Sequence, residues 1–406
     1  MEHPESPKPI TPMPDKSRSR IKHIVMGVVI LIIIIGFVNV VNNNVRFAFL
    51  DEEPPEIPDE PEPIPEMPIE EPEPQPQPLS YALTQTFESV NHARAALAVD
   101  IDNDGFIDIV AGNDGQNYLI KNEAGAQFAE QEQFGNSHTH AVAVLDFDND
   151  NDLDVIFGNY GQNKLFVNNG DGSFTEKDEF GNKYRNTEAL EITDIDGDDK
   201  DDVIVGNYNQ ENEIYLNNGD GTFTKDLKLG DSYTKDIIAE DFDGDGKKDI
   251  LVINYNQQCY LFINLGSGNF DQKEVFDIGY SNAAAATDFD NDGDVDVVLG
   301  NYNQPTYLYL NDGKGNFIKS TELINGYIHD IEASDINKDG KTDIIAGLYE
   351  QETSILINNG DNTFSSKMQL PKLYIHDIYI GNIDTDSGDE ILISADTNTL
   401  MLFNNP

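Results

Sequence analysis

The sequence predicts an all-β fold, a seven-bladed β-propeller closed by an N-terminal strand, within residues 81–406. An aspartate-rich window of nine residues recurs seven times at intervals of 46 to 48 residues. Each interval has room for four short strands rich in Val, Ile, Tyr and Phe, separated by Gly, Asn and Asp turns. Four strands in each repeat of about 47 residues are typical of propeller blades, with an open solenoid as the main alternative.

Residues 24–41, IVMGVVILIIIIGFVNVV, contain no charged residue and predict a transmembrane helix. A helix of this length spans about 27 Å, close to the ~30 Å hydrocarbon core of a bilayer. A cleaved signal peptide is the closer rival, but VNNNVRFAFL follows in place of a small-x-small cleavage site. Bases gather in residues 1–23, so the positive-inside rule predicts a cytoplasmic tail there and an extracellular propeller, in a single-pass protein of the cell surface.

Residues 42–80 are predicted to be an extracellular linker. Within it, residues 51–80 alternate acid and proline and hold 11 acids and no base. Proline removes amide donors and like charges repel, so neither helix nor sheet is available to this segment. We therefore expect an extended, Pro/Glu-rich stalk between the membrane and the propeller.

The two ends of the repeat region favour a closed ring. The seventh repeat stops at LMLFNNP, where the turn before its fourth strand would begin. Upstream of the first window, the pair Thr86–Phe87 matches Thr222–Phe223 and Thr363–Phe364. An N-terminal strand here can complete the last blade, and a closed ring leaves no sheet edge open. Phe87 lies 13 residues before its window, where the usual gap is 18, so a shorter connecting loop is expected.

The acidity of the chain is concentrated rather than spread. The chain has 75 acids against 25 Lys and Arg, a net charge of −50, and the seven windows alone hold 31 acids and 5 bases. This distribution disfavours a uniformly acidic surface of the halophile type, and the net charge disfavours nucleic acid as a partner. Repulsion inside each window needs a counter-charge, and a bound cation supplies one.

The fourth window, DFDGDGKKD, shows why these residue types suit calcium. Calcium takes roughly six to eight oxygen ligands at ~2.3–2.6 Å. Asp241, Asp243 and Asp245, at positions 1, 3 and 5 of a tight loop, are expected to point inward. Gly246 supplies the left-handed backbone of position 6, position 7 offers its carbonyl, and Asp249 at position 9 adds a last carboxylate. An EF-hand needs twelve positions and flanking helices, whereas strands flank this shorter loop.

These windows resemble the calcium-binding repeats of integrin α-subunit propellers, the FG-GAP/VCBS family, over about residues 81–406. The resemblance implies that each loop joins the first and second strands of a blade and binds calcium on the lower face of the propeller. The family's Gly-Ala-Pro signature is replaced here by GNY or GND, so VCBS-type relatives are the closer match.

The resemblance implies up to seven calcium sites. In chain order, the residues at positions 1, 3, 5 and 9 are Asp100, Asp102, Asp104 and Asp108; Asp146, Asp148, Asp150 and Asp154; Asp194, Asp196, Asp198 and Asp202; Asp241, Asp243, Asp245 and Asp249; Asp288, Asp290, Asp292 and Asp296; Asp335, Asn337, Asp339 and Asp343; and Asn382, Asp384, Asp386 and Glu390. Asn151 and Asp199 replace glycine at position 6, where Asn tolerates the left-handed conformation. The seventh window is the most altered, with Gly388 displaced by one. An Asx-rich turn is the alternative for any single window.

The opposite face is expected to carry rings of aromatic and polar side chains around the mouth of the central channel. The residues eight positions before the windows are His92, His138, Asn186, Tyr233, Tyr280, Tyr327 and Tyr374, and those six positions before are Arg94, His140, Glu188, Lys235, Asn282, His329 and His376. The loops of the type GNYNQ place Tyr160, Tyr208, Tyr255, Tyr302 and Tyr349 at equivalent positions. These nine tyrosines, with His140, His329 and His376, are the candidate ligand-binding residues.

Rings of Tyr, Asn, Gln and His suit a glycan or a surface protein as ligand, although Tyr and Asn that cap strands and pack between blades explain the same pattern. The sequence has no nucleophile elbow, phosphate loop or zinc signature. We therefore predict a protein without enzymatic activity, a membrane-anchored calcium-binding propeller for adhesion or ligand binding. An extracellular propeller lyase or dehydratase acting on a polysaccharide, with the ring histidines as bases, is the alternative. The sequence leaves the oligomeric state open.

The predicted topology has a direct test. Protease added to intact cells is expected to release a propeller fragment by cutting within residues 51–80, because the stalk is extended and outside. Immunoblotting of the medium measures the release. A propeller that stays protected, or one found only in the cytosol, contradicts the topology.

Overall fold

The computed structural model describes residues 81–404, apart from 89, 91, 124–127, 172, 384–387 and 396–398. The predicted transmembrane helix at 24–41 and the stalk at 51–80 lie outside these residues. Within the described part of the chain, no helix is long and apolar enough to cross a membrane. The described residues are all-β, as predicted, and form sixteen strands.

The strands follow one another without intervening helices. In chain order they are β1 (Ala82–Phe87), β2 (Ala93–Val99), β3 (Asp108–Asn122), β4 (Phe128–Leu145), β5 (Asp154–Asn168), β6 (Phe174–Thr193), β7 (Asp202–Asn217), β8 (Phe223–Glu240), β9 (Asp249–Gly266), β10 (Asn269–Thr287), β11 (Asp296–Asn311), β12 (Phe317–Ser334), β13 (Asp343–Asn358), β14 (Phe364–Gly381), β15 (Glu390–Ala395) and β16 (Thr399–Asn404). Every pairing between them is antiparallel.

The aliphatic run after each acidic window is buried on both faces. The first six residues of β9 are all buried, and the same holds for β3, β5, β7, β11, β13 and β15. Val, Ile and Leu dominate these runs because a sheet packed between two neighbouring sheets exposes neither face to water. The strand that leaves each window is thus the rigid element on which the acidic loop is mounted.

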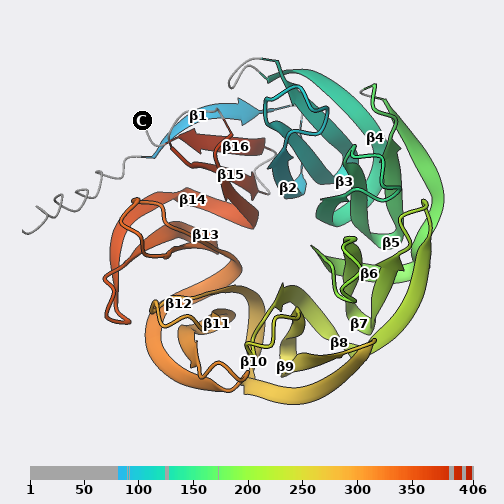
Figure 1. Cartoon of the computed structure of the whole chain (residues 1–406). Helices are drawn as coiled ribbons and strands as arrows, with labels where there is room; N and C mark the ends of the chain where they lie inside the picture. The colour runs from blue at the N-terminus through green and yellow to red at the C-terminus, as the bar shows by residue number, and fades with distance from the viewer. Residues whose placement is uncertain are drawn as a thin grey trace, which may run out of the picture. The chain divides into compact units, whose positions relative to one another are not determined.

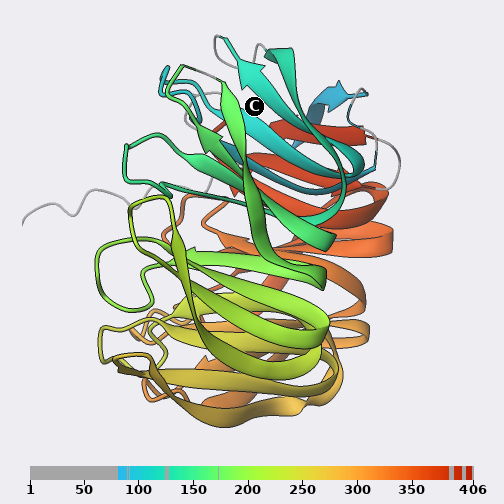
Figure 2. The same ribbon diagram turned by 90° about the vertical axis from the view of Figure 1, so that its right-hand side faces the viewer.

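Sequence reasoning predicted four short strands in each repeat, but the structure joins some of them. ILVIN and YLFIN, expected as separate strands, both lie in β9, whose first part pairs with β8 and whose second part pairs with β10. In the same way, β10 pairs with β9 through its first half and with β11 through its second half. Strands shared in this way link successive sheets into a ring around a central channel, the arrangement of a β-propeller (Figure 1), and Figure 2 shows these sheets from the side.

The ends of the described chain meet, as expected for a closed ring. β1 pairs with β16, with Thr86 opposite Met401 and Phe87 opposite Leu400 (Figure 1). Phe87 is buried and packs edge-on against Phe128, with ring centroids 5.2 Å apart. The predicted completion of the last sheet by an N-terminal strand is therefore confirmed.

The core lies between neighbouring sheets and reaches into the acidic loops. One cluster joins Leu251 and Leu261 of β9 to Val297 of β11, and it includes Phe242 at position 2 of the fourth window. The residues at position 2 of all seven windows are buried, namely Ile101, Phe147, Ile195, Phe242, Phe289, Ile336 and Ile383. Each loop is therefore held by a side chain in the core at position 2.

Removal of β1 is expected to destabilise the ring. A chain beginning at residue 92 should melt at a markedly lower temperature than one beginning at residue 79, because its β16 edge is unpaired and the site of Phe87 is empty. Thermal unfolding followed by circular dichroism measures the difference. Equal melting temperatures of the two chains would refute closure by β1.

Candidate functional site

The acidic loops adopt one backbone conformation in windows one to six. In the fourth, Asp241 accepts hydrogen bonds from the amides of Asp245 at 3.1 Å and Gly246 at 2.8 Å, and Asp245 accepts one from Lys247 at 3.0 Å. The same three bonds recur in the other five windows. Positions 1 and 5 therefore shape the loop.

Position 6 is left-handed, as the sequence predicted. Gly246 has a φ of 85°, and the non-glycine residues Asn151 and Asp199 have φ values of 71° and 63°. Position 4 is also left-handed, for example Asn103 at 58° and Lys338 at 59°. Sequence reasoning missed this second requirement, although Asn or Gly at position 4 of five windows was its signal.

Position 9 ties the loop to the rest of its repeat. Asp249 is fully buried and accepts hydrogen bonds from the amides of Phe242 at 3.0 Å and Asn264 at 2.7 Å. Burial raises the pKa of Asp249 to about 6, although these two amides lower it. Equivalent bonds hold Asp108, Asp154, Asp202 and Asp296. In the seventh window, Glu390 accepts from the amide of Ile383 at 2.6 Å.

Position 3 is different, because in several windows the backbone leaves one of its buried polar atoms unsatisfied. The buried Oδ1 atoms of Asp102, Asp148 and Asp290 have no hydrogen-bond partner, and neither polar side-chain atom of Asn337 has one. Asn337 is only 3 % exposed. An Asx-rich turn accounts for positions 1 and 5 and for most oxygens of position 9, but it leaves these oxygens and Oδ2 of Asp343 unexplained. Because buried oxygens without a donor are costly, their arrangement fits a bound cation.

The structure gathers the carboxylates at positions 1, 3 and 9. In five windows one oxygen from each lies within 4.8 Å of the others, and the groups are Asp100, Asp102 and Asp108; Asp146, Asp148 and Asp154; Asp194, Asp196 and Asp202; Asp241, Asp243 and Asp249; and Asp288, Asp290 and Asp296. Position 5 is not part of these groups. Mutual repulsion is evident at Asp148, whose pKa is raised by burial and by the nearby carboxylates of Asp150 and Asp146.

The predicted ligands of windows six and seven do not form such groups of three carboxylates among the described residues. In the sixth window, Asp335, Asp339 and Asp343 accompany Asn337, which supplies a neutral oxygen in place of a carboxylate. In the seventh window, Asp384 and Asp386 lie outside the described residues, while Asn382 and Glu390 lie within them. The structure therefore supports a cation site at windows one to six among the described residues.

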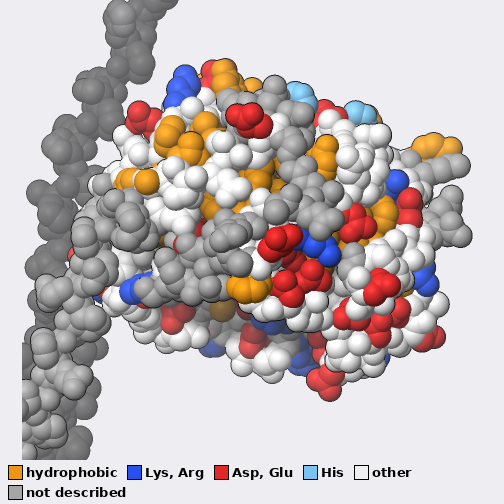
Figure 3. All heavy atoms as spheres, turned by 90° about the horizontal axis from the view of Figure 1, so that it is seen from above, with side chains coloured by type: hydrophobic (Ala, Val, Ile, Leu, Met, Phe, Trp, Pro, Cys, Tyr) orange, Lys and Arg blue, Asp and Glu red, His pale blue; other side chains and the backbone are white. Residues whose placement is uncertain are grey.

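A cavity of about 170 Å³ lies at the mouth of the channel, away from the acidic loops. It is lined by the seven residues that precede the windows by six positions, Arg94, His140, Glu188, Lys235, Asn282, His329 and His376, one from each innermost strand. In the edge-on view of Figure 3, acidic side chains gather towards the lower edge, whereas the visible His side chains lie at the upper edge. The seven residues that line this cavity are hereafter called the mouth ring.

The residues eight positions before the windows do not line this cavity, contrary to expectation. From His138 onward, each lies in a strand at the point where it passes from one sheet to the next, and there it pairs with the preceding strand. Four of the pairs are tyrosines, Tyr208 with Tyr233, Tyr255 with Tyr280, Tyr302 with Tyr327 and Tyr349 with Tyr374, with ring centroids 4.8 to 5.2 Å apart. Tyr160, by contrast, lies opposite Asn186 and is 61 % exposed.

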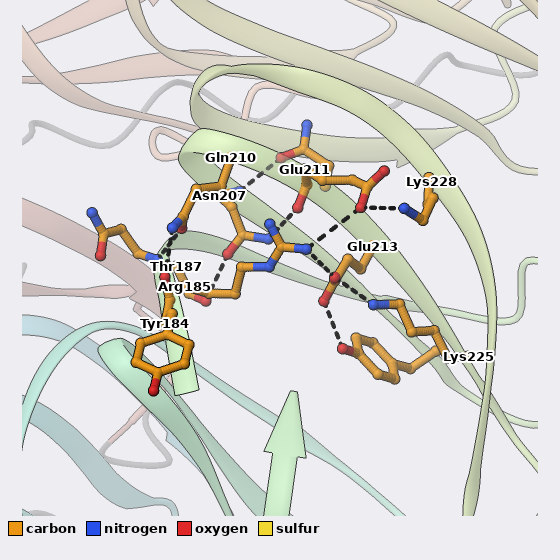
Figure 4. Close-up of polar contacts among 12 residues, drawn as sticks. Tyr184, Arg185, Thr187, Asn207, Gln210, Glu211, Glu213, Lys225 and Lys228 are labelled. Carbon is orange, nitrogen blue, oxygen red and sulfur yellow. Dashed lines mark hydrogen bonds and ion pairs between the residues drawn. The ribbon is translucent and has the colours of Figure 1, made fainter. Parts of the chain in front are cut away.

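Glutamines of the same hairpins hold the crossing strands in place. Gln210 accepts a hydrogen bond from the amide of Asn186 at 2.7 Å and donates one to the carbonyl of Tyr184 (Figure 4). Gln257, Gln304 and Gln351 accept from the amides of Tyr233, Tyr280 and Tyr327 in the next three repeats. These bonds fix the backbone from which the paired tyrosines project.

Sequence reasoning missed a group of acids deeper in the channel. Glu191, Asp236, Asp330, Glu332 and Asp377 line the larger cavity of about 410 Å³ that continues below the mouth ring. The signal was available, since Asp236, Asp330 and Asp377 stand five positions before their windows, where the other repeats have Ala. Each of these three aspartates accepts a hydrogen bond from the next repeat, and that of Asp377, from the amide of Ala96 at 2.8 Å, joins the last sheet to the first.

Two changes in the fifth window distinguish the structural carboxylate from the ligand. Asp296→Asn is expected to destabilise the protein by about 1–3 kcal/mol even with chelator, because its new amide cannot accept from both Phe289 and Asn311. Asp290→Asn is expected to leave chelated protein unchanged and to reduce only the stabilisation by millimolar divalent cation. Thermal melting with and without chelator tests both. An equal loss from the two variants in chelator would contradict this division of roles.

Comparison with known proteins agrees with this architecture. Among solved structures, two crystal structures of BBS1N in complex with ARL6DN, soaked with mercury or lead, match with a TM-score of 0.60 at 13% and 12% identity, over 81% of this chain and 98% of that one. A structure of an Agrocybe aegerita lectin that recognises non-reducing terminal N-acetylglucosamine matches with a TM-score of 0.52 at 22% identity, over 70% of this chain and 81% of the lectin. At these identities the likeness shows the fold alone.

No curated protein matches the chain. The model of the FG-GAP-like repeat matches residues 100–157, 146–205, 241–287 and 288–346, together more than half of the 406 residues. These matches cover windows one to six, and they confirm the resemblance drawn from the sequence. The chain therefore belongs to the family of FG-GAP-like repeat proteins.

Proposed function

We propose that the chain is a membrane-anchored, surface-exposed, seven-bladed propeller that uses calcium for stability and binds a glycan or protein ligand on the face opposite the acidic loops. The observation that carries this proposal is the separation of two kinds of site. The acidic loops present oxygens suited to a cation, and the opposite face presents aromatic side chains around a cavity. Binding without chemical turnover is the activity proposed.

Calcium is the cation that the loops suit best. Their donors are carboxylate, amide and backbone oxygens, and hard cations such as calcium prefer oxygen to nitrogen or sulfur. Burial, and after it the neighbouring carboxylates, raise the pKa values of Asp148, Asp196 and Asp290, so the acids at each site repel one another unless a cation is bound. Asn337 in the sixth window carries no charge, so calcium is expected to leave that site before windows one to five.

The aromatic side chains of the opposite face form a contiguous arc. Tyr255 contacts Tyr302, Tyr302 contacts His329, and His329 stacks on Tyr349, with ring centroids 6.4, 6.3 and 5.2 Å apart. Together with their hairpin partners, these residues cover the rims of several successive sheets. Aromatic rings that are partly exposed and held by backbone contacts favour ligand binding, because little conformational freedom is lost on contact. Tyr255, Tyr302, His329 and Tyr349, together with their hairpin partners, are hereafter called the tyrosine arc.

Calcium is expected to bind more tightly as the pH rises. In the metal-free structure burial raises the pKa of the position-9 aspartates from 3.8 to about 6, and that of Asp154 to about 7. The folded metal-free protein therefore holds more protons than the unfolded chain between about pH 4 and pH 7, and its stability falls as the pH rises through this range. Protons compete with calcium for the same oxygens.

Melting with chelator and with millimolar calcium, at about pH 5 and about pH 7.5, tests this linkage. The increase in melting temperature on adding calcium should be large at the higher pH and small at the lower one. An increase that is equal at both, or no effect of chelator at either, would contradict calcium binding at these loops.

The ligand face is tested by a screen of glycans and surface proteins against the full chain, with and without calcium. Tyr349→Ala is expected to lower the affinity for any ligand found by about tenfold, since stacked aromatic contacts contribute about 0.5–1.5 kcal/mol beyond the area they bury. Tyr307→Ala is the matched control, because Tyr307 pairs with Glu322 in the outer part of its sheet. The same loss in both variants, or binding insensitive to either, would place the ligand elsewhere.

A further inference from the structure

The mouth ring has the opposite charge balance to the rest of the molecule. The chain as a whole has a net charge of −50. The mouth ring has two permanently cationic side chains, Arg94 and Lys235, against a single carboxylate, Glu188, and its three histidines add positive charge when protonated. Within the mouth ring, unlike the chain as a whole, cationic side chains outnumber carboxylates.

The charges of the mouth ring are divided between two sectors. Glu188 lies 2.8 Å from the ammonium of Lys235 and 3.4 Å from the imidazole of His140, and it neutralises that side. On the other side, the guanidinium of Arg94 lies 3.3 Å from the ring of His376, and the rings of His376 and His329 are 5.7 Å apart. The mouth ring has no carboxylate in this second sector, so its positive charge is concentrated there.

Acids outside the mouth ring also lie around this sector. Asp114 lies 3.9 Å from Arg94 on the outer side and is also paired with His138. Deeper in the channel, burial raises the pKa of Asp330 to about 6 and that of Asp377 well above its usual value, so the negative charge of these acids is reduced at mildly acidic pH. Burial likewise raises the pKa values of Glu191, Asp236 and Glu332.

A metal ion in the channel is disfavoured by geometry. Within the described part of the chain, the groups of three or more His, Cys, Asp or Glu with ligand atoms within 4.8 Å of one another all belong to the acidic loops. The cavity of about 170 Å³ is smaller than the ~300–1,000 Å³ of a typical ligand pocket, so it suits one group of a larger ligand. The rest of such a ligand would lie on the tyrosine arc. His329 belongs to both the arc and the mouth ring, so the two surfaces are continuous.

We propose that the mouth ring binds the carboxylate of an acidic saccharide whose sugar rings stack on the tyrosine arc. This inference rests on the proposed ligand-binding function and names the class of ligand. The planar fork of Arg94 matches a carboxylate, and Lys235, His329 and His376 supply further positive charge around it. At about 0.15 M salt the acids of the distant loops are screened over about 8 Å, so the mouth ring and the channel acids below it decide the sign of the attraction.

Three probes test the proposal by isothermal titration of the full chain in millimolar calcium. They are a trimer of galacturonic acid, the same trimer with its carboxylates methyl-esterified, and a trimer of glucosamine. The acidic trimer should bind at least about tenfold more tightly than its ester, because one charge-assisted contact contributes that much. Arg94→Gln should remove this difference without changing the affinity for the ester. Lys228→Gln, a cation paired with Glu211 away from the mouth ring, is the matched control and should change neither.

The outcomes separate this inference from the proposed function. If both trimers bind equally and Tyr349→Ala weakens both, the anionic site is overturned and the saccharide-binding face stands. If the glucosamine trimer binds more tightly than the galacturonic acid trimer, the anionic site is also overturned, because the channel acids then select a cationic ligand. Failure of all three trimers to bind overturns the acidic saccharide as ligand and leaves the protein ligands of the wider screen. If Arg94→Gln does not fold, His376→Gln carries the same test.

Discussion

The buried carboxylate at position 9 of each acidic window is the contact on which the rest of the structure depends. Asp249 accepts the amide of Phe242 in its own loop and the amide of Asn264 at the far end of β9. Asn264 then donates its side-chain amide to the carbonyl of Ile195, in the loop of the preceding repeat, at 2.8 Å. Asn168, Asn311 and Asn358 make the same bond, also at 2.8 Å, in other repeats. One carboxylate thus connects a loop, a strand and the neighbouring sheet.

This connection explains why so much negative charge is tolerated beside a hydrophobic core. The position-9 carboxylates that accept hydrogen bonds from backbone amides also lie within 4.8 Å of a position-3 carboxylate oxygen in five windows. In several windows a buried position-3 oxygen has no hydrogen-bond partner. The proposed binding of a cation would therefore stabilise the contact between repeats as well as the loop itself. A propeller whose sheets contact one another at every loop gains from each cation bound, since binding to the folded state alone stabilises it.

The repeat is nearly uniform on the face with the acidic loops and varies on the opposite face. On the loop face every repeat needs the same local geometry, so the side chains at positions 1, 5 and 9 vary little. On the opposite face the hairpins are held by Gln and Asn side chains bonded to backbone atoms, which leaves the neighbouring positions free to differ. The mouth ring uses this freedom, because no two successive repeats contribute the same residue to it except His329 and His376.

The sequence alone determined the features that lie within one repeat. The period predicted the acidic loops, the buried strands that follow them and the left-handed residues at position 6. It also located the residues of the mouth ring, because their distance from each window is constant. These features depend on short stretches of chain, where turn chemistry and strand alternation are encoded locally.

Only the tertiary structure decided how one repeat meets the next. The bond from Asn264 to Ile195, the closure from Asp377 to Ala96 and the pairing of Tyr302 with Tyr327 join positions whose relation depends on the rotation between sheets and the path of the crossing strands. The orphan oxygen of Asn337 likewise became visible only once every neighbouring donor had been placed. A periodic pattern specifies each repeat, but the packing of side chains between sheets sets the angle and register at which repeats join.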